Sequence, residues 1–126
     1  MAVEQRIHDN GFMVAAADLS AKKFRCVKVS GDFAVNICGV AGEQAYGVLQ
    51  NIPASGQVAN VRDLGISRVI VGTGGLTAGQ KWMTDGNGAA VLATTGKHAV
   101  GIVLQGAIAT EIATVTVGYG VDAQVA

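Results

Sequence analysis

Short apolar segments rich in Val, Ile and Ala alternate with glycine-centred breaks along most of the chain. Apolar and polar positions alternate most clearly in residues 67–71 and 113–117, and this period of two is typical of a strand with one buried face. The chain contains 18 glycines and one proline, and the glycines divide it into segments of strand length. Regularly spaced turns around such segments predict an all-β fold, either a small barrel or a sandwich.

Nine strands are predicted from this pattern, over residues 24–30, 33–38, 45–50, 57–62, 67–71, 81–84, 89–94, 98–105 and 111–117. Helical periodicity is almost absent from the sequence. A single helical turn is predicted over residues 18–23, where the side chain of Asp18 or Ser20 could cap it.

The chain also contains an internal repeat at an offset of about 55 residues. Each half contains a hairpin with a glycine turn, a strand that ends in Leu-Gln, a short loop and an alternating strand. The turn Asp85-Gly86-Asn87-Gly88 supplies residues that tolerate positive φ, as tight hairpins require. We therefore predict one β domain over residues 18–126, made of two related halves at about 18–71 and 72–126. The matching segments are 30–35, 45–50 and 57–61 in the first half and 85–91, 99–105 and 111–115 in the second.

The N-terminal segment, residues 1–17, lies outside this repeat and is predicted to be an extended arm. It carries both charge signs and a few isolated apolar residues. Such a segment cannot pack a core of its own, so we expect residues 1–12 to be mobile until a partner orders them. Arg6, Ile7 and Phe12 are then candidate contacts with that partner, the apolar pair as anchors and Arg6 beside an acidic group.

Length and charge narrow the function classes. A chain of 126 residues has the size of one domain. Nine basic and nine acidic residues give zero net charge, and no basic run could neutralise a row of phosphates, so we expect no nucleic-acid partner. Only 14% of the residues are charged, which leaves a surface of small and apolar side chains that suits coverage by a partner or self-assembly. Neither a secretory signal nor a membrane span is expected, and the protein should be made in a cytoplasm.

The glycine-rich segment Gly72-Thr73-Gly74-Gly75-Leu76-Thr77 does not predict a nucleotide site. A dinucleotide loop needs a third glycine and a helix directly after it, whereas Thr77 and another strand-like segment stand there. A phosphate loop needs lysine where this chain has Gln80. We therefore predict no cofactor.

Residues for catalysis or metal binding are equally sparse. His8 and His98 are the only histidines, and neither has a nucleophile or an orienting acid at a suggestive spacing. Cys26 and Cys38 could face each other in a hairpin, but in a reducing compartment they are more simply two half-buried thiols. No metal-ligand spacing occurs. The sequence predicts a protein that is not an enzyme, with no metal site.

Trp82 is the single tryptophan of the chain. With so few aromatic residues there is no strip on which sugars or bases could stack. Trp82 is therefore predicted to be a core residue or an anchor at a subunit interface.

Three segments, residues 17–29, 47–61 and 100–107, resemble the small capsid decoration, or cement, proteins of tailed bacteriophages, and the resemblance extends over about residues 12–118. It implies a β-barrel or β-tulip-like domain, commonly a homotrimer. It also implies that the chain binds the major capsid protein on the outside of an icosahedral shell and stabilises it. The chain would be assembled in the host cytoplasm and would end on the virion surface. Two alternatives remain open: a ring-forming tail or other virion β-module, and a small-ligand-binding barrel.

Overall fold

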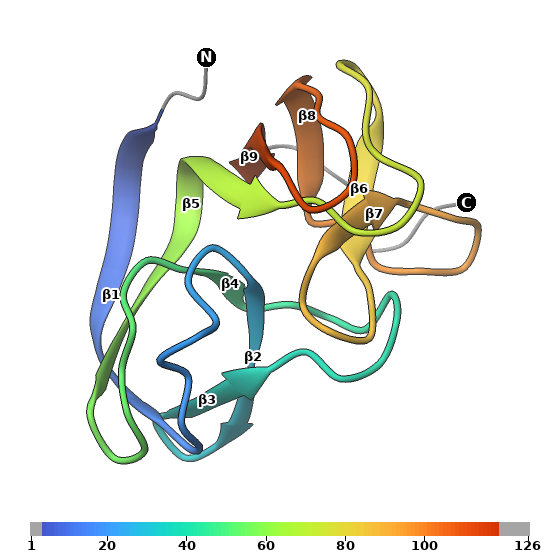
Figure 1. Cartoon of the computed structure of the whole chain (residues 1–126). Coiled ribbons are helices and arrows are strands. Elements are labelled where there is room, and N and C mark those ends of the chain that lie inside the picture. The colour runs from blue at the N-terminus through green and yellow to red at the C-terminus, as the bar shows by residue number, and fades with distance from the viewer. Residues whose placement is uncertain (1–3, 119–126) are drawn as a thin grey trace.

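The computed structural model describes residues 4–118, and within them the side chains of all but residues 5–7 and 10. This part of the chain forms nine strands and no helix (Figure 1), which confirms the predicted all-β fold. Each predicted strand overlaps an observed one. The strands are β1 (Gln5–Ala15), β2 (Cys26–Gly31), β3 (Ala34–Ile37), β4 (Gly47–Leu49), β5 (Val58–Ile70), β6 (Lys81–Thr84), β7 (Ala90–Leu92), β8 (Gly101–Gln105) and β9 (Ile112–Val117).

Turn chemistry places the β6–β7 hairpin where the sequence predicts it. Asp85 Oδ1 accepts hydrogen bonds from the backbone N–H groups of Asn87 and Ala89, at 2.8 and 2.9 Å. Gly88 closes the turn with a φ of 77°, a left-handed conformation that glycine adopts without steric cost. The local sequence is therefore sufficient to fix this hairpin.

Residues 18–23 form turns and not the predicted helical turn. Asp18 Oδ1 accepts a hydrogen bond from the backbone N–H of Ser20 at 3.0 Å. Such a contact between residues two apart is an Asx turn, which satisfies the backbone locally and competes with helix formation.

β5 is one strand of 13 residues where the sequence predicts two, over 57–62 and 67–71. Asp63 and Gly65 are residues typical of turns, but the strand continues through them. Asp63 lies at a register shift of the β1–β5 pairing, and Gly65 pairs with Arg6 of β1 and Val117 of β9. The φ of Gly65 is 136°, which is open to glycine and lets a paired strand bend. Figure 1 shows β5 turning sharply between its two halves.

Strands β1 to β5 close into a small barrel, the first barrel, in the order β1-β3-β2-β4-β5 with β1 paired back onto β5. β1 runs antiparallel to β5 and meets β3 in parallel at Val14 and Ala15. Met13 and Ala15 are buried in its core. The expectation of a mobile N-terminal arm is therefore wrong: residues 5–15 are extended, but they are a barrel strand. Their charged side chains suggested an arm because the partners of those charges lie far along the chain.

The remaining strands form a second barrel that shares β5 with the first. Its order is β5-β9-β8-β6-β7, and a parallel bridge between Val71, just after β5, and Ala90 of β7 joins the two ends of this order. The first part of β5 thus belongs to the first barrel and its last part to the second. The two barrels are fused through one continuous strand (Figure 1).

The two barrels repeat the same pairing register. In the hairpins, Val27, Lys28 and Val29 pair with Ile37, Asn36 and Val35, just as Trp82, Met83 and Thr84 pair with Leu92, Val91 and Ala90. The same holds for the closing strand, since Met13 pairs with Ala59 as Val69 pairs with Ala113. The internal duplication is therefore present in the pairing, and it starts at β1, so the repeat boundary predicted at residue 18 is too late.

Each barrel has its own buried cluster, and the positions correspond. The Leu19 N–H donates to the carbonyl of Pro53 as the Leu76 N–H donates to that of Ala107, at 2.9 Å in both cases. Cys26, Cys38 and Val48 of the first barrel join the second cluster, so the barrels pack on each other. The first cluster contains Met13, Ala15, Leu19, Val27, Val35, Leu49, Ala59 and Val61, and their counterparts are Val69, Val71, Leu76, Trp82, Ala90, Val103, Ala113 and Val115.

Candidate interaction surface

Trp82 lies in the core of the second barrel and is fully buried. Its indole N–H donates a hydrogen bond to the Thr116 carbonyl at 3.0 Å, so its one polar atom is satisfied inside the barrel. Of the two roles predicted for Trp82, the structure assigns the core. The predicted role of Trp82 as a contact for another subunit or a shell is therefore wrong, because none of its surface reaches solvent.

Arg6 and Ile7 lie on β1, where the backbone of Arg6 pairs with Gly65. Their side chains are outside the described part of the chain, so the contacts predicted for them stay predictions. Their backbone belongs to a barrel strand and not to a free arm.

Phe12 is 62% exposed and meets a second exposed aromatic residue, Phe33, which is 66% exposed. The two rings make an edge-to-face contact with centroids 5.8 Å apart. Val14 of β1 and Val58 of β5 pair with each other, and both side chains are exposed and apolar. We call Phe12, Val14, Phe33 and Val58 the aromatic face. The β2–β3 turn, the end of β1 and the start of β5 meet at the end of the first barrel that points away from β6–β9 (Figure 1).

Phe33 holds its exposed ring on a backbone that favours glycine. Its φ is 51°, and its counterpart in the second barrel is Gly88, with a φ of 77°. A bulky residue in the left-handed region costs on the order of 1 kcal/mol. The first barrel therefore carries a strained, solvent-facing phenylalanine where the second barrel carries glycine, and packing in the core does not explain that choice.

In the second barrel the region equivalent to the aromatic face is partly covered by the first barrel, and Gly88 is buried there. The N–H of Cys26 donates to the Gly88 carbonyl at 2.7 Å, and the N–H of Ile70 donates to the Phe24 carbonyl at 2.9 Å. A Cβ added at Gly88 would lie 2.6 Å from Ile37 Cδ1, so close approach requires glycine there. The same region of the fold is thus an internal contact in one barrel and an open apolar surface in the other.

Sequence reasoning found Phe12 but missed Phe33. The signal was present in the repeat, because residues 30–35 align with residues 85–91 in a way that sets Phe33 against Gly88. A phenylalanine at a glycine position of a turn marks a side chain that the turn itself does not require. The β1–β3 contact that brings Phe12 beside Phe33 was not predictable, because β1 was taken as an arm.

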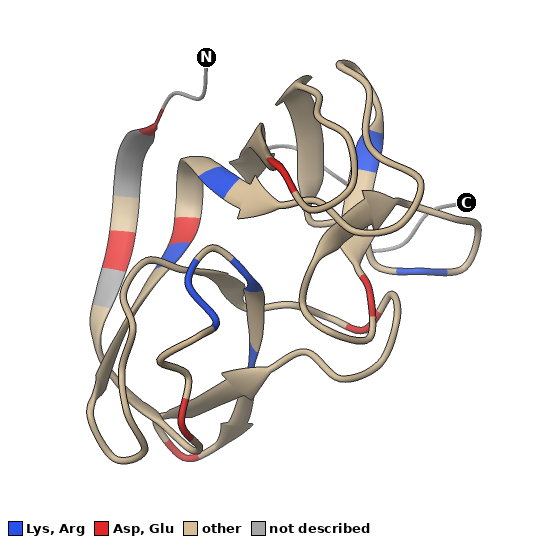
Figure 2. Cartoon of the chain, viewed as in Figure 1, with Lys and Arg blue, Asp and Glu red and all other residues tan. Residues whose placement is uncertain are grey.

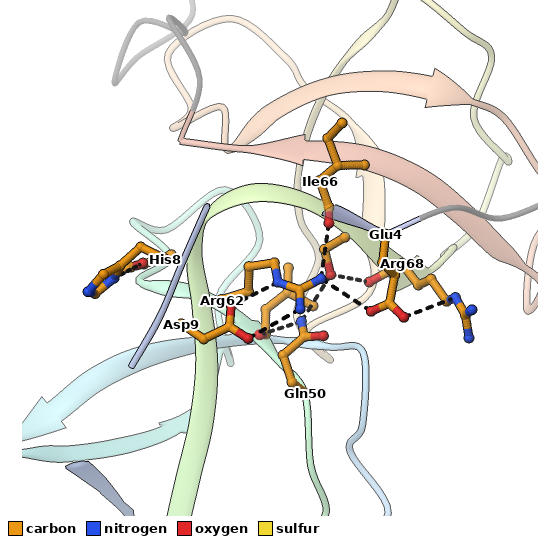
Figure 3. Close-up of polar contacts among 10 residues, drawn as sticks. Glu4, His8, Asp9, Gln50, Arg62, Ile66 and Arg68 are labelled. Carbon is orange, nitrogen blue, oxygen red and sulfur yellow. Dashed lines mark hydrogen bonds and ion pairs between the residues drawn. The ribbon is translucent and has the colours of Figure 1, made fainter. Parts of the chain in front are cut away.

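A charged cluster fastens β1 to β5 near the junction of the two barrels (Figure 3). Arg62 donates from Nε and Nη2 to the two carboxylate oxygens of Asp9, at 2.8 and 3.2 Å, and from Nη1 to Glu4 at 3.2 Å and to the Ile66 carbonyl at 3.0 Å. The hydrogen bonds and charge of Asp9, with Glu4, raise the pKa of the Arg62 guanidinium. Arg68 Nε lies 3.5 Å from Glu4. Arg68 Nε is buried and makes no hydrogen bond, but each charge of the cluster lies beside an opposite charge, so the cluster is a structural clasp.

His8 and Asp63 extend the clasp at its outer side. His8 Nδ1 lies 2.6 Å from Asp63 Oδ1, and the imidazole is more than half exposed. The contact supplies a second link between β1 and β5.

The two thiols are fully buried and not half-buried as expected. Burial raises the pKa of Cys26 well above its usual value and raises the pKa of Cys38 to about 11. Both are therefore protonated at neutral pH. Since the thiolate is the reactive form, neither cysteine is poised for nucleophilic chemistry.

The described residues include an open groove but no cluster of metal ligands. No group of His, Cys, Asp and Glu in residues 4–118 could hold a metal ion, and no helix in this range could cross a membrane. An open surface groove of about 530 Å³ is lined by Lys28, Val29, Glu43, Gln44, Ala45 and Tyr46. Figure 2 shows acidic and basic residues at many places on the described ribbon, with one short basic stretch in the loop before β2.

Comparison with known proteins identifies the fold. No family model matches the sequence, and no curated protein is similar to it. One solved structure similar to this chain is the N base of the head fiber gp8.5 in bacteriophage phi29, with a TM-score of 0.69 and 18% sequence identity. The match covers 88% of this chain and 95% of that chain. The two proteins therefore share a fold over nearly their whole lengths.

Proposed function

We propose that this chain is a structural protein of a bacteriophage virion that binds the outer surface of the icosahedral head and stabilises it. The fold carries the proposal, because the double barrel matches a head fiber base across 95% of that chain. The sequence resemblance to capsid decoration proteins supports the same location by a separate route. Together they favour a protein that stands on the head.

The interior of the molecule favours a structural binding role over a small-ligand-binding barrel. Each barrel has a buried cluster of apolar side chains in its core, as in a packed interior and not a ligand-binding lumen. The buried thiols and the ion-paired clasp provide no reactive group, so we infer a protein without catalytic activity. A weakly charged surface with exposed apolar residues lowers the desolvation cost of covering it.

We further propose that the chain acts as a homotrimer. Zero net charge removes the repulsion that keeps copies apart, and the resemblance to decoration proteins implies trimers at three-fold positions. A trimer would add several weak shell contacts by avidity. Mass photometry should give three times the chain mass of 12.7 kDa, and a persistent dimer would contradict it.

The test uses heads purified from a phage that lacks this gene. Purified protein is mixed with the heads and sedimented, and the melting of the heads is followed with and without it. We expect saturable binding to heads and a higher temperature of head disruption when the protein is bound. Binding to isolated tails and not to heads would favour the ring-forming tail module. Binding to neither would contradict the proposal.

A further inference from the structure

We infer that the aromatic face is the surface through which this chain contacts the phage shell, and that Phe12 and Phe33 enter an uncharged, apolar hollow there. The inference rests on the proposed function and names the contact that the function needs. Its starting point is the asymmetry between the repeats: the region of the second barrel that contacts the first barrel at Gly88 and Ile70 corresponds to an open surface of the first barrel.

The chemistry of the face defines its partner. None of its four side chains is charged or polar, and the two aromatic rings are each more than three-fifths exposed. Burial of such rings removes apolar area from water, which is favourable, and requires no compensating charge on the partner. Rigid aromatic anchors of this kind dominate the binding energy of protein interfaces when they fill a pocket.

The backbone of Phe33 adds a second, independent observation. The chain holds the ring out on a left-handed residue where the other repeat uses glycine. Glycine at this position would relieve the backbone strain, and the contact described for the ring is with Phe12, another exposed side chain. A contact of the two rings with a partner would account for a phenylalanine in this conformation.

The area of the face favours the shell over a second copy. With Phe presenting about 200 Å² when fully exposed, the face offers roughly 400 Å². A stable two-protein interface takes about 800 Å² from each partner, so this face alone would not hold a dimer. Small contacts repeated over an array add by avidity, which a symmetric shell provides.

The internal barrel contact also cannot be repeated between copies at this face. In the second barrel Gly88 lets the first barrel come so close that a Cβ added at Gly88 would lie 2.6 Å from Ile37 Cδ1. Phe33 at the equivalent position blocks the same approach by another copy. Since the face lies at the end of the molecule that points away from the second barrel, contact there would leave the second barrel projecting outward.

The test compares variants in the head-binding assay. Each substitution introduces the residue type found at the equivalent position of the second barrel. Phe33→Gly follows Gly88, and Phe12→Arg follows Arg68. The double variant should keep its melting temperature or raise it, keep its oligomeric mass, and bind heads at least about tenfold more weakly, since two buried anchors are lost. The matched control is Phe24→Gly, which changes the same residue type at another left-handed position, φ 63°, and should bind heads as the wild type does.

Three outcomes would overturn the inference. Heads that bind the double variant as tightly as the wild type would place the contact elsewhere and leave the proposed function intact. Loss of the oligomer in the double variant would make the face a contact between copies. Failure of the wild-type protein itself to bind heads would remove the proposed function and this inference with it.

Discussion

The first and second barrels have corresponding cores but different outer surfaces at corresponding positions. Eight buried positions of the first barrel have a buried equivalent in the second. At one of them the first barrel has Val27 and the second has Trp82. By contrast, Phe12 and Phe33 of the first barrel correspond to Arg68 and Gly88 of the second. The comparison indicates that the fold constrains the inside of both repeats, whereas the outside differs according to what each repeat touches.

Closure also differs between the barrels. The parallel contact that closes each barrel has two residue pairs in the first, Val14–Ala34 and Ala15–Val35, and one bridge in the second, Val71–Ala90. Thr116 of the second barrel stands at the position of Arg62, so only the first barrel has ion pairs at this point.

Removal of most of β1 should lower the stability of the first barrel more than any other change. Deletion of residues 2–11 takes away most of β1, Asp9 and Glu4 included, which opens the first barrel and leaves Arg62 without its carboxylates. We expect the melting temperature to fall by at least about 10 °C, or the chain not to fold, because a loss of 1 kcal/mol shifts the midpoint by about 4–8 °C in small domains. Circular dichroism melts of both chains measure this. A melt equal to that of the full chain would show that β1 behaves as an arm after all.

The corresponding core positions should differ in the cost of truncation. Trp82→Ala should lower the free energy of unfolding by about 3–5 kcal/mol, and Val27→Ala by about 2 kcal/mol, since two methyl groups and their contacts are lost. Trp82→Phe keeps most of the apolar volume and serves as the control. Urea titrations give the three values. Equal losses at Trp82 and Val27 would mean that the tryptophan does not fill the second core.

The clasp should show strong coupling between its partners. Arg62→Met alone leaves Asp9 buried without its cation, and we expect a loss of about 3 kcal/mol. Asp9→Leu in the same background should recover much of that loss, because no buried charge is left unpaired. Lys28→Met is the control: the Lys28–Glu43 pair at 3.3 Å is partly exposed, so its loss should be below about 1 kcal/mol. Additive effects at Arg62 and Asp9 in a double-mutant cycle would contradict the clasp.

The smallest effect concerns the left-handed positions that the repeats share. Phe24, Phe33 and Thr110 correspond to Gly79, Gly88 and Gly56, and all six have positive φ. Gly79→Ala meets no atom within 4 Å, so its expected cost of about 1 kcal/mol is backbone strain alone. Gly39→Ala is the control, because Gly39 is equally open and is not among the positive-φ residues; it should be neutral or slightly stabilising. Equal melts for the two variants would remove the strain argument.

The sequence was sufficient for features that local chemistry determines. The hairpin at Asp85–Gly88 and the alternation in residues 113–117 depend on neighbours within a few residues, and the structure contains both. The strands at 57–62 and 67–71 were placed correctly but not joined, because Asp63 and Gly65 are turn formers in isolation. Only pairing with β1 and β9 makes them part of one strand.

The features that could not be predicted from the sequence depend on partners far along the chain. The charges at Glu4 and Asp9 predicted an arm because their cation, Arg62, is more than 50 residues away. The apolar Phe12 was found by its isolation, whereas Phe33 could be recognised only once its turn was compared with Gly88. Trp82 remained ambiguous because neither composition nor spacing distinguishes a core tryptophan from an interface anchor.

The most direct test of the account is electron cryomicroscopy of heads from the gene-deleted phage, imaged with and without added protein. The account predicts extra density on the outside of the head at three-fold positions, with the aromatic face of the first barrel against the shell and the second barrel outward. Density absent from the head surface, or a molecule that meets the shell through its second barrel, would contradict it.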